Sequence, residues 1–179
     1  MLTACQEKTS TSDLYYPIDS LLRAQILTLA NHKARLIKTA DLEGEESKID
    51  FVPDSLEWVK EFEVFNSLSV INKPVYKGLY SVSEKTENGF FRREFTTDEP
   101  DLPVQALSLI YFSPNNLKRL EARYRESNSM YKGTRHLVME FEDQKGKQFL
   151  THYSISGEQK MFLSDSVSYF VDARVSYTK

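Results

Sequence analysis

Apolar residues near the start of the chain recur at the period of an α-helix. The positions that repeat in this way are Ile18, Leu21, Leu22, Ile26 and Leu29. Asp19 or Ser20 can cap the first turn, because the side-chain oxygen of either residue accepts a hydrogen bond from a free backbone N–H. The pattern predicts a helix with one apolar face.

A second helix is indicated by the residues that follow Pro53. Asp54 and Glu57 have the spacing of a capping box, in which each side chain accepts a hydrogen bond from the backbone N–H of the other residue. The apolar residues after the cap are expected to form the buried face of this helix. They are Leu56, Val59, Phe62 and Phe65, with Trp58 alongside.

From Lys73 onward, apolar positions alternate with polar ones, which is the period of a β-strand. The strands expected there are 75–83, 90–97, 104–112, 117–126, 134–142, 148–156 and 167–177, and two shorter strands are expected within 34–52 around a turn at Gly44. Turn sequences separate the later strands at 88–89, 113–116, 127–129, 144–146 and 156–157. Connections this short join antiparallel neighbours.

These elements predict an α+β domain. We expect a curved antiparallel β-meander of about seven to nine strands with two amphipathic helices packed on one face. The strand at 104–112 is apolar on both faces, so the helices are expected to cover its outer face.

Eight tyrosines lie in or beside the expected strands, and many of them fall on inward positions. The eight are Tyr76, Tyr80, Tyr111, Tyr124, Tyr131, Tyr153, Tyr169 and Tyr177. A tyrosine hydroxyl buried without a partner is costly. Either these hydroxyls reach the rim of the sheet, which is the interpretation we favour, or the concave face encloses a partly polar pocket.

Composition excludes several classes of protein. The formal net charge of −3 gives no general basic field, so nucleic acid is not expected as a partner. The longest nearly uninterrupted apolar run, 104–112, is far shorter than the roughly 20 residues of a membrane-spanning helix. Phosphate loops, dinucleotide glycine motifs and nucleophile elbows are also missing from the sequence.

Cys5 is the only cysteine, so the chain cannot form an internal disulfide. It follows Leu2, Thr3 and Ala4, and a leucine with two small residues before a cysteine is the sequence that bacterial lipoprotein peptidases cleave. Residues 6–13 are polar and without an apolar period, which predicts a tether. We therefore divide the chain into a lipidation site and tether at 1–14 and a single α+β domain at 15–179.

Over Leu2 to Cys5 and the tether, the chain resembles bacterial lipoproteins. The resemblance implies that the Cys5 thiol is acylated, that the chain is cut just before it, and that the lipid anchors the domain to a membrane. Gln6, in a position where aspartate marks the other sorting class, implies the outer membrane of the bacterial cell envelope, with the domain in the periplasm or at the surface. Only Met1 precedes the motif, so we expect the native start to lie upstream.

His136, His152 and Glu140 are expected on one face of a strand pair, with the two histidines as diagonal neighbours. Three such ligands could hold zinc, but a polar sheet exterior is the favoured interpretation, and we expect no metal or other cofactor.

Arg119, Arg123 and Arg125 form a partly basic stripe on one strand. The stripe could meet lipid headgroups or an acidic partner, although an ordinary charged face is favoured.

Two classes of function remain open. The favoured one is a non-enzymatic, monomeric envelope lipoprotein domain that binds an apolar or lipid ligand or scaffolds an envelope-protein partner. Its layout resembles that of the half-barrel lipoprotein-localisation factors, which hold acyl chains between a curved sheet and helices. The alternative is a cell-envelope hydrolase that uses carboxylates, with Asp165, Asp172, Glu140 and Glu142 as candidates.

Overall fold

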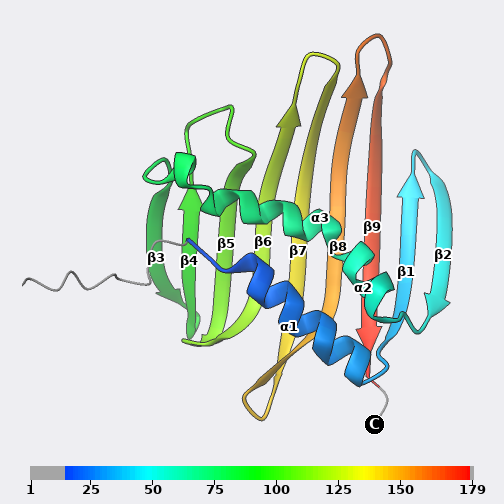
Figure 1. The fold of residues 1–179 in the computed structure, drawn as a ribbon, viewed down its shortest axis with the longest axis vertical. Helices are drawn as coiled ribbons and strands as arrows, with labels where there is room; N and C mark the ends of the chain where they lie inside the picture. The colour runs from blue at the N-terminus through cyan, green and yellow to red at the C-terminus, as the bar shows by residue number, and fades with distance from the viewer. Residues whose placement is uncertain (1–14, 178–179) are drawn as a thin grey trace, which may run out of the picture.

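Nine strands form one antiparallel sheet, and the helices cross one of its faces (Figure 1). The computed structural model describes residues 15–177. The strands are β1 Arg35–Leu42, β2 Glu45–Phe51, β3 Ser81–Glu87, β4 Phe90–Thr96, β5 Val104–Ser113, β6 Asn116–Ser127, β7 Tyr131–Gln144, β8 Lys147–Met161 and β9 Ser166–Ser176. The expected α+β arrangement of an antiparallel sheet with helices on one face is confirmed.

The order of the strands explains why the helices lie on the sheet. From β3 to β9 each strand pairs with the next in sequence, and the β1–β2 hairpin is added through pairing of β1 with β9. β2 and β3 are therefore the two opposite edges of the sheet. The connection between them must cross the whole sheet, and it does so as a helical band, while α1 crosses below it in the view of Figure 1.

The band is made of short helices. It comprises α2 Ser55–Glu61, α3 Glu63–Asn66 and the 3-10 turns η1 Ser67–Asn72 and η2 Pro74–Tyr76, and it follows α1 Ile18–Asn31. The capping box at the start of α2 is confirmed: the Asp54 carboxylate accepts from Glu57 N, and the Glu57 carboxylate accepts from Asp54 N, both at 2.8 Å. Among residues 15–177, no helix combines the length and the apolar character needed to cross a bilayer.

Aromatic rings fill the space between the helical band and the middle of the sheet. Trp58, Phe62 and Phe65 are fully buried and share one side of the band. Phe62 and Phe65 both pack edge-on against Tyr153 of β8, with ring centroids 6.0 and 5.8 Å apart. This cluster attaches the band to the sheet, because large aromatic side chains bury the most apolar surface per residue.

Three buried or partly buried tyrosines have partners for their hydroxyls. The Tyr80 hydroxyl donates to Val104 O at 2.9 Å, and the Tyr177 hydroxyl donates to Leu150 O at 2.8 Å. The Tyr153 hydroxyl donates to the Glu61 carboxylate at 2.7 Å, and burial together with this bond raises the pKa of Tyr153. Tyr80 and Tyr153 are core residues and Tyr177 is partly buried, as a core interpretation expects. The expectation that the hydroxyls reach the rim of the sheet is wrong for Tyr80 and Tyr153, whose partners lie inside the domain.

Two expectations about the helices are wrong. Neither Asp19 nor Ser20 caps α1: the helix begins at Ile18 without a side-chain cap, and Asp19 instead accepts a hydrogen bond from Ser69. Leu56 and Val59 are not buried, since 71% and 51% of their surface is exposed. At 100° per residue, Trp58, Phe62 and Phe65 fall within about 60° of one another, and Leu56 points to the opposite side.

Three expectations about the strands also need correction. The strand expected at 75–83 begins only at Ser81, because Pro74 starts a 3-10 turn. Gly157 ends no strand: it lies inside β8, where a side chain would collide with the Tyr169 ring of β9. The helices cover Leu107 and Leu109 of β5, whereas Ala106 and Ser108 on the other face are buried beneath neighbouring side chains of the sheet.

Candidate functional site

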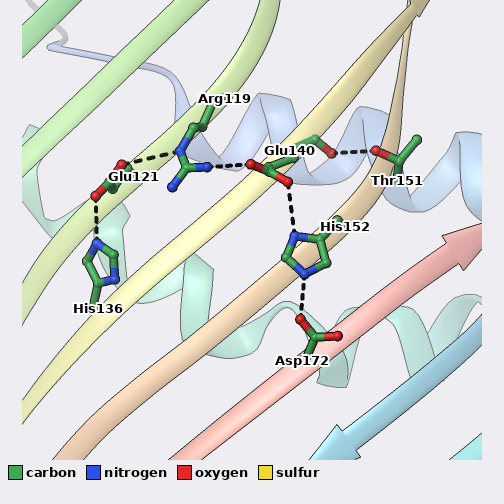
Figure 2. A network of polar contacts seen from close by, with 7 residues as sticks. All are labelled: Arg119, Glu121, His136, Glu140, Thr151, His152 and Asp172. Atoms are coloured by element: carbon green, nitrogen blue, oxygen red, sulfur yellow. Dashed lines mark hydrogen bonds and ion pairs between the residues drawn. The ribbon is translucent and has the colours of Figure 1, made fainter.

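The uncovered face of the sheet carries a chain of ion pairs that runs across four strands (Figure 2). Arg119 on β6 contacts Glu121 on the same strand at 3.2 Å and Glu140 on β7. Glu121 in turn contacts His136 Nε2 at 2.7 Å. Charges of opposite sign therefore alternate along this part of the face.

His152 on β8 continues the chain between two carboxylates. Its Nε2 lies 2.7 Å from Asp172 Oδ1, and its Nδ1 lies 3.2 Å from Glu140 Oε2 (Figure 2). The second contact is an ion-pair distance without hydrogen-bond geometry, and Nδ1 has no other partner among residues 15–177. An imidazole donates from both ring nitrogens only as the imidazolium.

The ion pairs from His136 to Asp172 form a network that is partly exposed to solvent. Burial raises the pKa of Glu121, but the hydrogen bond with His136 and the charge of Arg119 outweigh it, so the pKa lies below its ordinary value. The side chains involved are a quarter to two fifths exposed. Pairs at this exposure contribute little to stability individually.

The two histidines are not the diagonal neighbours that the sequence suggested. The turn after β7 contains two residues, Lys145 and Gly146, and not three. An irregularity after Glu140 then shifts the register, so that His152 lies directly opposite Glu140 and His136 opposite Ser156. Each histidine has its own carboxylate partner, and no group of three or more potential ligands in residues 15–177 could hold a metal ion.

The carboxylates considered for a hydrolase do not form a free pair. Glu140 and Asp172 converge, but His152 lies between them and Arg119 occupies Glu140 as well. Glu142 and Asp165 are exposed and lie away from this network. Glu142 is near the end of β7, and Asp165 is in the loop just before β9. Among these four carboxylates, no two face each other across an open space, as acid and base roles on opposite sides of a substrate require.

The basic stripe of Arg119, Arg123 and Arg125 does not act as one positively charged surface. Arg119 is held by two carboxylates, whereas Arg123 and Arg125 are exposed. Arg123 lines a hollow on the uncovered face together with His136 and Ser156. The stripe is therefore part of a mixed-charge surface.

A second feature lies on the outer side of the helical layer, between α1 and the band of α2 and α3. It is a groove of about 680 Å³ floored by the buried side chains Leu22 and Phe62. Leu27 and Val59, both more than half exposed, stand at its sides. The remaining lining residues are Asp19, Arg23, Ile26, Lys60, Glu63 and Asn66.

The groove follows from two helical repeats. Asp19, Arg23 and Ile26 recur at helical spacing on α1, as Val59, Glu63 and Asn66 do along the band, so each set lies on one face. The result is an apolar floor with a rim of both charges. Ligand sites commonly have this combination of apolar lining and few polar groups, at volumes of roughly 300 to 1,000 Å³.

The groove was not predicted from the sequence, because Val59 was expected to lie in the core. The signal was present, since the apolar residues of 56–65 spread around more of the helix than one buried face requires. Cys5 and the rest of the lipoprotein motif lie outside the described residues.

Comparison with known proteins adds no relative: no protein-family model, curated protein or solved structure matches the chain significantly.

Proposed function

We propose that this chain is a membrane-anchored lipoprotein of the bacterial cell envelope whose domain binds an apolar ligand without catalysing a reaction. The observation that carries the binding role is the groove between α1 and the helical band. Leu27 and Val59 expose apolar surface there that a partner could remove from water. The ligand class that fits is an acyl chain or a similarly narrow apolar molecule with a polar end for the charged rim.

The non-enzymatic part of the proposal rests on the ion-pair network. Each of its carboxylates contacts an arginine or a histidine, as is usual for ion pairs on a protein surface. The lipoprotein part rests on the sequence from Leu2 to Cys5. Residues 6–13 are polar and without an apolar period, which is typical of a tether between an anchor and a domain.

Binding in the groove can be tested with palmitic acid as the probe. Saturating fatty acid at 100 times its dissociation constant should stabilise the native state by about 2.7 kcal/mol, because it binds only that state. For a domain of this size the melting temperature should rise by about 5–10 °C. Native mass spectrometry of the protein purified from bacterial membranes should also detect a retained lipid.

Replacement of Leu27 and Val59 together by aspartate should abolish both the rise in melting temperature and the retention of lipid. The bound acyl chain would have to remove water from two carboxylates at the sides of the groove, which is unfavourable. Val75→Asp is the matched control: Val75 is equally apolar and 71% exposed, and it does not line the groove. Protein that arrives without lipid and gains no stability from palmitic acid would refute the binding role.

The anchor gives a separate prediction. When the chain is expressed behind a lipoprotein signal sequence in bacteria fed with labelled palmitate, the label should be incorporated, and Cys5→Ser should abolish it because the thiol is the acyl acceptor. Ser10→Ala, in the same tether, should leave labelling unchanged. Equal labelling of the Cys5→Ser protein would show that the lipoprotein assignment is incorrect.

A further inference from the structure

Two hairpin tips, β6–β7 and β8–β9, stand clear of the helical layer at one end of the sheet (Figure 1). They present four large apolar side chains to solvent. These are Met130 on the first tip and Met161, Phe162 and Leu163 on the second, with Phe162 70% and Leu163 91% exposed. Contiguous apolar surface of this kind marks a site of interaction with a protein or a membrane.

The tips are held together and shaped by hydrogen bonds. Phe162 N donates to Met130 O at 2.8 Å, which joins the two tips. The Asn128 side-chain oxygen accepts from Met130 N and Tyr131 N at 2.9 and 2.8 Å. The apolar side chains are therefore presented by an ordered structure.

Leu163 is unfavourable in two respects. Its φ of 67° lies in the left-handed region, which a leucine adopts at a cost in backbone energy. Its side chain is almost wholly exposed to water. Neither feature stabilises an isolated domain, and both are accounted for if the side chain enters an apolar phase.

Two lysines lie directly below the apolar tip. Lys132 on β7 and Lys160 on β8 are opposite each other in the register, and like charges in that position repel. Neither lysine has an ion-pair partner within residues 15–177. Both line a hollow of about 250 Å³ between the tips, together with Met130, Phe162 and Leu163. An anionic group placed there would neutralise the repulsion.

The acidic residues nearby form no ion pair with Lys132 or Lys160 among residues 15–177, although Glu158 and Asp165 keep their negative charges. Glu158 accepts a hydrogen bond from Ser166, and Glu126 pairs with Arg135. Asp165 is the one acidic residue of the loop between β8 and β9. An apolar tip bordered by unpaired lysines is complementary to a bilayer whose phosphate groups lie just outside its apolar core.

We propose that the paired tips bind the surface of an anionic phospholipid bilayer. The side chains of Met130, Met161, Phe162 and Leu163 enter the boundary between headgroups and acyl chains, and Lys132 and Lys160 contact the phosphates. This surface is distinct from the groove and from Cys5, so its test is independent of the proposed function.

The experiment uses the full chain with Cys5→Ser, which removes the anchor, in co-sedimentation with vesicles of phosphatidylcholine containing phosphatidylglycerol. Phe162→Ser combined with Leu163→Ser should weaken binding by at least about tenfold, because two apolar side chains no longer leave water. Lys132→Gln and Lys160→Gln should each weaken it by about fivefold. The lysine effects should vanish on vesicles of phosphatidylcholine alone.

The matched control is Leu56→Ser combined with Val75→Ser, at two apolar residues that are as exposed as Phe162 but lie on the helical band. It should bind like the parent protein. The proposal is overturned if the parent protein does not bind the anionic vesicles, or if the control loses as much affinity as the tip variant. It is also overturned if sedimentation velocity shows that the tips join two copies of the chain and vesicles bind independently of them.

A fluorescent label separates insertion from simple adsorption. With Cys5 replaced by serine, Leu163→Cys provides a single thiol for an environment-sensitive dye. Its emission should shift to the blue and rise when anionic vesicles are added. The same dye on Leu56→Cys should show no change, and equal shifts at both positions would refute insertion through the tips.

Discussion

Trp58→Ala should lower the free energy of unfolding by about 3–5 kcal/mol, because the indole is fully buried and its removal leaves a cavity. The ring packs on Phe62 with centroids 5.6 Å apart, in the cluster that attaches the helical band to the sheet. Urea unfolding followed by circular dichroism measures the change. Since Trp58 is the only tryptophan, the parent protein should also show blue-shifted emission that moves to the red on unfolding.

Two further variants test the reason for that loss. Trp58 Nε1 has no hydrogen-bond partner in the part of the chain that the structure describes, so Trp58→Phe removes an unsatisfied buried N–H and should cost much less than Trp58→Ala. Leu56→Ala, two residues away on the exposed side of α2, should change stability by no more than about 0.5 kcal/mol. A similarly small change for Trp58→Ala would be incompatible with the helix-on-sheet packing.

The periodicity of the sequence predicted most of the elements, because the signals involved are local. Alternation identified the strands from β4 to β9, and the Asp54–Glu57 spacing identified the start of α2. Asn88-Gly89 was expected to form a turn, and both residues do have the positive φ of a tight hairpin turn.

Long-range pairing and register were beyond local patterns. Nothing in 35–42 specifies that β1 pairs with β9, since an alternating strand can join either edge of a sheet. The irregularity after Glu140 interrupts the alternation of β8, because Leu150 and Tyr153, three residues apart, both lie in the core. Together with the two-residue turn after β7, it sets the register that separates His136 from His152. The candidate sites depend on such arrangements: the groove needs two helices side by side, and the tip needs two hairpins joined by Phe162.

One partly buried interaction between a helix and the sheet had no signature in the sequence. Glu61, at the end of α2, accepts a hydrogen bond from the Tyr153 hydroxyl and forms an ion pair with Lys38 Nζ at 2.5 Å. The three residues come from α2, β8 and β1, and the ion pair is only about a fifth exposed. A lysine on the covered face of β1 is tolerated because this carboxylate neutralises it.

Glu61→Ala should therefore lower the free energy of unfolding by about 2 kcal/mol. It leaves the Lys38 ammonium and the Tyr153 hydroxyl without the partner that balances their burial, and the partial exposure keeps the loss below the 3–5 kcal/mol expected of a fully buried pair. Urea unfolding at neutral pH measures it. Glu63→Ala, at an exposed position two residues further on, should change stability by no more than about 0.5 kcal/mol.

A double-mutant cycle distinguishes the loss of the partner from a general weakening of α2. Lys38→Met removes the charge that Glu61 neutralises but keeps the apolar stem packed on the sheet. If the ion pair accounts for the effect, Glu61→Ala should cost much less in the Lys38→Met background, with a coupling of about 1 kcal/mol or more between the two changes. Strictly additive losses would mean that Glu61 stabilises the helix by another route, and that Lys38 is kept in place without it.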